Sequence, residues 1–359
     1  MGGGTLSDYM NSAHAFECVF CHGGRNEELT KAEAHSGLII DPTGGDENKC
    51  ALCHEQIAEH FATSLHNTLR GYTHLFEQRT GVSVDSDPAI RAKFDAQCNK
   101  CHATCGDCHI NRPSSVGGGL IQGHLIRRNA DMTNQCTACH GSRVGDEYTG
   151  RNEGLRADVH YVPGGMQCRG CHTGAEMHGD GNEYNHRYEV QNAANCGNCH
   201  DFVPGENAWH DQHGDEFSCQ VCHAQDYKNC TTCHAGDGLQ EPSWMDFKVG
   251  RNPIPAQRAG ELVVLRHIPI AVETYESWGV TATNYASVPS FKYATPHNIV
   301  RWTSRTDTSG GQSCANACHN TPDGPQGWFL RASDLSLLPV SEQQANQSLM
   351  VPDGPPPWR

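Results

Sequence analysis

Hydrophobic positions along the chain form only short periodic runs. Apolar residues recur at four-residue steps over residues 55–69, which predicts an amphipathic helix. A second helix is expected over residues 27–35, and a third begins at Asp87 and Pro88, where an N-cap residue precedes a proline of the first turn. Glycine-rich stretches such as 116–120 separate these runs. The pattern predicts mostly coil with short α-helices.

Strand-like runs occur only in the C-terminal part, over residues 261–265 and 281–302. They predict a small β-containing domain over residues 237–359 with a proline-rich tail, following a core of residues 1–236. The most apolar stretch contains an arginine and a histidine and is far shorter than the roughly 20 residues of a membrane-spanning helix. No transmembrane segment is therefore expected.

Composition leaves little material for ordinary apolar cores. The mean hydropathy is −0.61, aromatic residues make up 7% of the chain, and glycine and proline number 38 and 18. Something other than side chains is expected to fill the interior. The net charge of −15, with scattered basic residues, argues against a nucleic-acid partner, because phosphate contacts require clustered positive charge.

The 20 cysteines fall into ten close pairs, and a histidine directly follows the second cysteine of every pair. Nine pairs have the spacing C-x-x-C-H, and the tenth has one additional residue between its cysteines. In chain order, motifs 1 to 10 are Cys18, Cys21 and His22; Cys50, Cys53 and His54; Cys98, Cys101 and His102; Cys105, Cys108 and His109; Cys136, Cys139 and His140; Cys168, Cys171 and His172; Cys196, Cys199 and His200; Cys219, Cys222 and His223; Cys230, Cys233 and His234; and Cys314, Cys318 and His319.

C-x-x-C-H is the attachment signature of haem c: two thiols form thioethers to the porphyrin, and the histidine is the proximal ligand of the iron. Structural zinc sites and disulfides also use cysteine pairs, but neither needs a histidine after every pair. Histidine occupies 23 of 359 positions, so ten such histidines by chance have a probability on the order of 10^-12. The pattern favours ten covalently bound haems, and only motif 10 keeps a disulfide or an unattached pair as an alternative.

Ten proximal histidines leave 13 of the 23 for the sixth coordination positions. The candidate distal ligands are His14, His35, His66, His74, His124, His160, His178, His186, His213, His267 and His297. His60 and His210 are the expected spares, because each lies near another candidate on a helical segment. Met166 and Met177 are alternative axial ligands that would raise a reduction potential.

With these motifs the chain resembles the multihaem c-type cytochromes, and among them the decahaem electron conduits and the polymerising extracellular cytochromes of metal-respiring microbes. The resemblance extends over residues 14–319. It implies coil and short helices wrapped around a stacked haem chain, bis-histidine ligation, and electron transfer without catalytic residues. Since haem c is attached outside the cytoplasm in prokaryotes, it also implies an extracellular or cell-surface protein, or alternatively a periplasmic one, whose signal peptide has been removed.

The resemblance implies other redox proteins as partners, self-association into a filament, and an extracellular metal or mineral acceptor. The alternative function is a multihaem reductase or oxidase of nitrogen or sulfur oxyanions with one open haem. The abundance of histidine ligands disfavours an open iron position, and the net negative charge disfavours anionic substrates.

Overall fold

Short helices joined by long loops make up most of the molecule. The computed structural model describes residues 6–214, 216–229, 244–269, 271–309, 313–319 and 327–351. The side chain of His319 in motif 10 and the tail over residues 352–359 lie outside this part of the chain. So do Cys230, Cys233 and His234, which make up motif 9, and their predicted role in haem attachment therefore stays a prediction from the sequence.

The chain divides into two compact units. Unit 1 consists of Met1–Arg70, Asn99–Gly141 and Cys168–Asn192, and unit 2 consists of Gly71–Cys98, Ser142–Gln167 and Ala193–Arg359. These units do not coincide with the domains expected over residues 1–236 and 237–359, because motifs 7 and 8 and the early segment Gly71–Cys98 belong to unit 2. The reason is apolar packing: Phe76 and Phe94 are buried in the same cluster as Tyr275 and Trp278, far along the chain.

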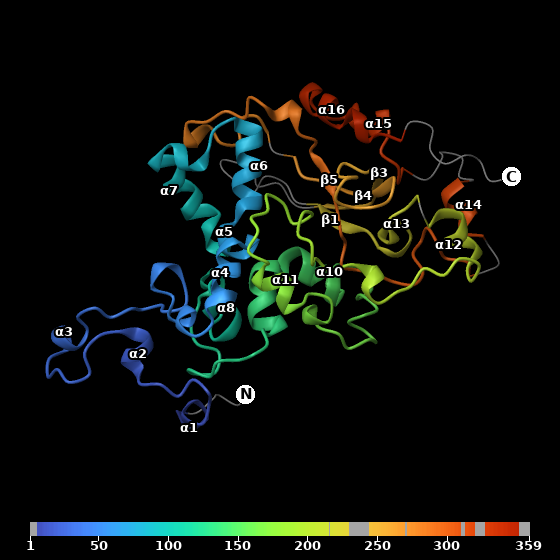
Figure 1. Cartoon of the computed structure of the whole chain (residues 1–359). Helices are drawn as coiled ribbons and strands as arrows, with labels where there is room; N and C mark the ends of the chain where they lie inside the picture. Colours follow the sequence, from blue (N-terminus) through green and yellow to red (C-terminus); the bar gives the residue numbers. More distant parts are fainter. Residues whose placement is uncertain are drawn as a thin grey trace. The chain divides into compact units, whose positions relative to one another are not determined.

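Unit 1 is built from helices of nine residues or fewer in its described part. They are α1 Leu6–Met10, α2 Cys18–His22, α3 Lys31–Ala34, α4 Glu55–Thr63, α5 Leu65–Thr68, α8 Cys105–His109, α9 Thr137–His140 and α11 Gly174–His178 (Figure 1). The helix expected over 55–69 is interrupted at Ser64, which has extended backbone angles and whose hydroxyl accepts the Asn67 N–H to start α5. The helix expected over 27–35 is the single turn α3.

Unit 2 contains the longer helices and all the described strands. Its helices are α6 Arg70–Thr80, which starts at the end of unit 1, α7 Pro88–Gln97, α10 Asp146–Thr149, α12 Ala208–His213, α13 Cys219–His223, α14 Cys314–His319, α15 Ala332–Leu335 and α16 Val340–Asn346. The start of α7 confirms the prediction, because Asp87 Oδ1 accepts the Ala89 N–H at 2.7 Å and Pro88 occupies the first turn.

The strands form two small antiparallel sheets. They are β1 Tyr227–Asn229, β2 Trp244–Asp246, β3 Lys248–Arg251, β4 Leu262–His267 and β5 Phe291–Tyr293. β1 pairs with β2, and β4 lies between β3 and β5, with Val264 opposite Val249 and Leu265 opposite Tyr293. The run expected over 261–265 is therefore a strand, whereas the run over 281–302 contains only β5. The Phe291 N–H donates to Asn346 Oδ1 at 3.0 Å and ties α16 to this sheet (Figure 1).

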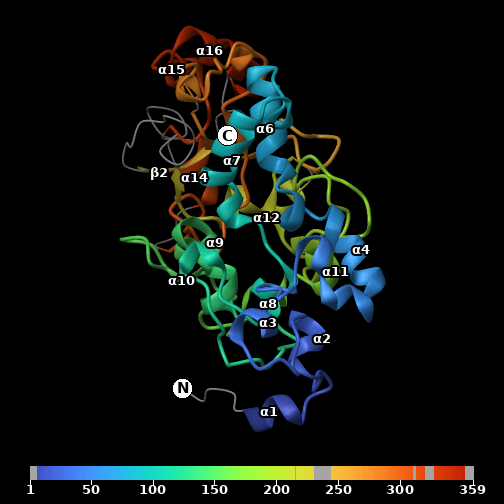
Figure 2. The same cartoon turned by 90° about the vertical axis from the view of Figure 1, so that its left-hand side faces the viewer.

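Unit 2 has two apolar cores of a conventional kind. One contains side chains of α6 and α7, which run side by side in Figure 2, packed against Tyr275, Trp278 and Tyr285. The other joins Tyr227 and Phe247 to the sheet of β3, β4 and β5. These cores are absent from unit 1, where Leu69 and Met132 are the buried apolar residues among those described. No helix in the described ranges combines the length and the apolar character needed to cross a membrane.

Candidate metal centres

Four of the described cysteine motifs are folded as a short α-helix. Motifs 1, 4, 8 and 10 coincide with α2, α8, α13 and α14. Residues three or four apart lie on the same face of a helical turn, so both thiols of a C-x-x-C motif point to one side. The extra residue of motif 10 changes the spacing from three to four, which keeps Cys314 and Cys318 on a common face. The 18 described cysteines form no disulfide with one another.

The second cysteine of several motifs lies at the surface. Cys53, Cys171 and Cys199, which belong to motifs 2, 6 and 7, are all exposed. Each follows a short 3-10 turn that contains the first cysteine of its motif. An exposed thiol is accessible to the vinyl group of an incoming porphyrin, so these positions fit the predicted thioether role.

Histidine rings in the described part of the chain face one another in pairs. Each of six pairs joins the histidine of one motif to a histidine outside the motifs. The pairs and their ring-centroid distances are His54 with His14 at 6.2 Å, His22 with His124 at 6.0 Å, His140 with His66 at 6.2 Å, His109 with His178 at 6.1 Å, His200 with His160 at 5.9 Å, and His223 with His210 at 6.2 Å. The six centroid distances fall within a narrow range, whereas the angles between the ring planes vary from 27° to 84°.

This spacing fits an axially ligated iron between the two rings. A metal–imidazole bond of about 2 Å on each side, plus about 1 Å from each nitrogen to its ring centre, separates the centroids by about 6 Å. No group of three or more His, Cys, Asp or Glu side chains with metal-binding geometry occurs among the described residues. Two imidazoles are one pair of axial protein ligands that a six-coordinate haem iron can take, so the donor set fits haem c.

The histidine of motif 3 is placed by its backbone. His102 follows the 3-10 turn Asn99–Cys101, and its N–H donates to the Asn99 carbonyl at 2.9 Å. The residue is half-buried. The six ring pairs do not include His102, so its role as a proximal ligand stays a prediction from the motif.

Hydrogen bonds at Nδ1 orient several of the paired rings. His22 Nδ1 donates to the Ile39 carbonyl at 2.9 Å, and His109 Nδ1 donates to the Arg127 carbonyl at 2.6 Å. Because a carbonyl oxygen can only accept, Nδ1 carries the proton and Nε2 keeps the lone pair that binds a metal. Gly23 makes the first contact possible: its φ is +62°, and a Cβ there would lie 2.6 Å from the Gly37 carbonyl oxygen.

Two other histidines donate Nδ1 to a carboxylate. His172 of motif 6 lies 3.0 Å from Glu176 Oε2, and this hydrogen bond raises the pKa of His172. His160, which faces His200, lies 2.8 Å from Asp158 Oδ1. Both carboxylates fix the ring orientation of a candidate ligand, as outer-shell partners do in metal sites.

Burial keeps several of the paired rings uncharged. It lowers the pKa of His66 and of His178, and it is also the main cause that lowers the pKa of His223. A metal ligand must offer an unprotonated nitrogen. These three imidazoles are therefore in the protonation state that ligation requires.

The packing around the motifs leaves apolar surface available for a porphyrin. Phe20 and Leu52 lie between the two cysteines of motifs 1 and 2, and their exposed fractions are 45% and 64%. Isolated exposed apolar residues are common, but here they sit beside the attachment cysteines of a unit with almost no apolar core among its described residues. A large apolar cofactor would supply the buried surface that the side chains do not.

Cysteines of different motifs lie in direct contact. A hydrogen bond from one thiol lowers the pKa of its neighbour, as Cys101 does for Cys139. The contacts join Cys50 with Cys105, Cys101 with Cys139, Cys136 with Cys168, and Cys196 with Cys219. Motifs 2 and 4, 3 and 5, and 5 and 6 are therefore neighbours through cysteines of unit 1, and motifs 7 and 8 are neighbours in unit 2.

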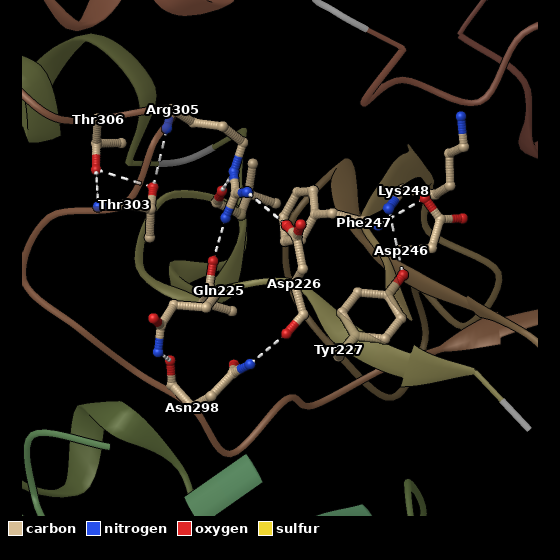
Figure 3. A network of polar contacts seen from close by, with 12 residues as sticks. Gln225, Asp226, Tyr227, Asp246, Phe247, Lys248, Asn298, Thr303, Arg305 and Thr306 are labelled. Atoms are coloured by element: carbon tan, nitrogen blue, oxygen red, sulfur yellow. Dashed lines mark hydrogen bonds and ion pairs between the residues drawn. The ribbon is translucent and has the colours of Figure 1, made fainter. Parts of the chain in front are cut away.

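A polar network in unit 2 holds motif 8 against the segment that follows β5 (Figure 3). The buried Arg305 guanidinium lies 3.4 Å from the centre of the Phe247 ring and donates to the Val221 and Ala224 carbonyls. Thr303 Oγ1 donates to the Cys222 carbonyl at 3.1 Å, and His223 Nδ1 lies 3.3 Å from the Val300 carbonyl oxygen. Several long-range contacts thus fix the position of one motif histidine.

The other candidate ligands occupy varied surroundings. His35 follows α3, His74 lies in α6, and the His186 ring centroid lies 5.9 Å from that of Tyr188. The His213 ring lies edge-on to Phe217 at 5.2 Å, and the His297 N–H donates to Glu147 Oε2. The sequence offered no reason to prefer His210 over His213, yet the ring that faces motif 8 is that of His210, the expected spare.

His267 makes contacts of a different kind. Its Nε2 is hydrogen-bonded to the Glu342 carboxylate, and its ring stacks on Phe291 with the centroids 4.4 Å apart. The candidate ligand nitrogen is therefore already engaged inside unit 2. Its position in β4 explains this, because that strand packs into an apolar core.

Comparisons with known proteins provide no further assignment. A scan against protein-family models, a search of curated proteins and a search of solved structures each found no match to this chain.

Proposed function

We propose that this chain is a ten-haem c-type cytochrome that conducts electrons along its covalently bound haems. Each motif would attach one haem through its two thiols and ligate the iron through its histidine. When bound, haem c supplies an iron that takes up and releases one electron reversibly. The chain's own residues then determine which sites are neighbours and how each iron is ligated.

The six histidine pairs support electron transfer in preference to catalysis. A pair such as His22 and His124, or His66 and His140, would place an imidazole on both faces of the iron. No position would remain for a substrate at these six sites. A reductase needs at least one open position, which these six sites would not provide.

The contacts between cysteines of different motifs carry the proposal. Cys136 of motif 5 touches Cys168 of motif 6, while Cys139 of the same motif touches Cys101 of motif 3. In unit 2, Cys222 of motif 8 lies near Cys318 of motif 10. Attachment points this close make neighbouring haems a consequence of the fold, so electrons can pass from one site to the next.

Location and partners follow from the same chemistry. Haem c attachment takes place outside the cytoplasm, so we place the protein at the cell surface or in the extracellular space. The net charge of −15 favours cationic redox proteins and metal cations as partners. Self-association into a filament would extend the conduit beyond one chain.

Intact-mass spectrometry combined with low-temperature EPR tests the proposal. Ten haems of roughly 0.6 kDa each should add about 6 kDa to the 39.2 kDa chain, and the oxidised protein should show only low-spin iron. A double variant in which serine replaces both Cys314 and Cys318 should lack the mass of one haem. A chain isolated from a haem-attaching host without added mass would overturn the proposal, and a stoichiometric high-spin signal would indicate a catalytic haem instead.

A further inference from the structure

The described Nδ1 acceptors of the ligand histidines differ in charge. His22, His109 and His223 face backbone carbonyl oxygens, which are neutral. His172 and His160 face carboxylates at 3.0 and 2.8 Å. The first three belong to motifs 1, 4 and 8, whereas His172 belongs to motif 6 and His160 lies opposite His200 of motif 7.

Glu176 is held in place by its own helix. The Thr173 hydroxyl caps α11 by accepting the Glu176 N–H at 3.3 Å, and the glutamate stands one turn after His172. Its side chain is 13% exposed. The carboxylate therefore lies against the imidazole in largely buried surroundings, where screening by water is weak.

Asp158 is held even more firmly. Its side chain is 4% exposed, and Oδ1 accepts both the backbone N–H and the Nδ1–H of His160, each at 2.8 Å. Oδ2 accepts the Ile299 N–H at 2.8 Å. Three hydrogen bonds thus keep this carboxylate next to the ligand ring.

We propose that Glu176 and Asp158 are positioning residues that make the sites of motifs 6 and 7 the most reducing of those whose Nδ1 acceptor is described. A hydrogen bond to an anion raises the basicity of a ligating imidazole, and a nearby negative charge favours the ferric over the ferrous state. Both effects lower the reduction potential relative to a site with a carbonyl acceptor. The inference rests on haem attachment at these motifs, as proposed above.

The two sites lie in different units, motif 6 in unit 1 and motif 7 in unit 2. Each unit therefore contains one site that gives up its electron most readily. Cys168 of motif 6 touches Cys136, and Cys196 of motif 7 touches Cys219. Each low-potential site thus has a neighbouring motif that can accept its electron.

Glu176→Gln is the most direct test. Glutamine can still accept the Nδ1–H bond through its amide oxygen but carries no charge. A spectroscopically monitored potentiometric titration of the haem-loaded full chain should show about one tenth of the haem absorbance moving to higher potential. The expected change is at least tenfold in the reduction equilibrium constant, which is 59 mV for a one-electron couple. Asp158→Asn should move a second tenth in the same direction.

Two control variants each remove a carboxylate whose local backbone contacts resemble those of Glu176 or Asp158. Glu33 follows a capping threonine in α3 as Glu176 does in α11, but its carboxylate accepts the Thr30 hydroxyl rather than an imidazole. Asp87 Oδ1 accepts the N–H two residues ahead, as Asp158 does, without a histidine. Glu33→Gln and Asp87→Asn should leave the titration unchanged.

The mass of each sample separates the two proposals. Unchanged potentials in a Glu176→Gln protein that retains ten haems would overturn the role of the carboxylate and leave haem attachment intact. A wild-type mass without haem would overturn the proposed function itself. If the variants lose haem, the wild-type titration decides: a low-potential component of about two tenths supports the proposal, and a single narrow wave over all haems refutes it.

Discussion

Replacing His210 with alanine tests the geometric pairing where it differs most from the sequence pattern. His210 and His213 are three residues apart on α12 and share a helix face, and the sequence pattern gave His213 as the candidate ligand and His210 as the spare. The structure places the His210 ring centroid 6.2 Å from that of His223 at an interplanar angle of 80°. That distance is close to the sum of two distances of about 3 Å, each from an iron to the centre of a ligating imidazole ring.

The expected effect is a change of spin state at one site. Without the His210 imidazole, the iron of motif 8 would keep His223 and take water or no ligand on its other face. About one tenth of the haem should become high-spin in low-temperature EPR, with the haem content quantified on the same sample. The haem itself should stay attached, because Cys219 and Cys222 are unchanged.

Gln212→Ala provides the matched control, because Gln212 is exposed on the same helix. It should leave all iron low-spin. A fully low-spin His210→Ala protein with complete haem content would refute the assignment. If His213→Ala alone produced the high-spin tenth, the ligand favoured by the sequence would be the correct one.

Two further predictions concern unit 2. Glu147→Gln should lower the free energy of unfolding by about 3–5 kcal/mol in denaturant titrations, because the buried Arg266 guanidinium would lose the carboxylate that lies 2.6 Å from it. Glu261→Gln, which breaks the exposed ion pair with Arg251, should lower it by less than about 1 kcal/mol. Equal effects of the two substitutions would contradict this reasoning. Burial lowers the pKa of Lys292 to about 7, below its unfolded value of about 10.4, so the unfolded chain binds a proton that the folded chain lacks and stability should rise from pH 7 to 10. Lys292→Met should flatten that rise in urea midpoints, and an unchanged slope would exclude this lysine as its source.

Features that depend on neighbouring residues were predictable from the sequence. Asp87 and Pro88 start α7 as expected, because capping is a contact between residues two or three apart. The interruption at Ser64 was missed, although serine is a common N-cap residue, because the four-residue apolar period continues through it. The segment Gly71–Cys98 joins unit 2 through apolar contacts with residues far along the chain, which no local pattern records.

The candidate histidine ligands also show what the sequence could and could not predict. His14, His66, His124, His160 and His178 were candidates by number alone, and the fold places each opposite a motif histidine. His267 had equal standing as a candidate until Glu342, from a distant helix, was found on its Nε2. The number of histidines in the sequence showed how many candidate ligands there are, but not which motif histidine each of them faces.

The number and position of the cysteine–histidine motifs can be read from the amino-acid sequence. Their geometry is local, because a single helical turn brings two thiols to one face and needs only five or six consecutive residues. The folded chain, in contrast, sets which histidine faces which motif, which motifs are neighbours, and whether a carbonyl or a carboxylate accepts each described Nδ1 proton. Those contacts join residues distant in the chain, and their energies depend on burial and charge that exist only once the loops have folded together.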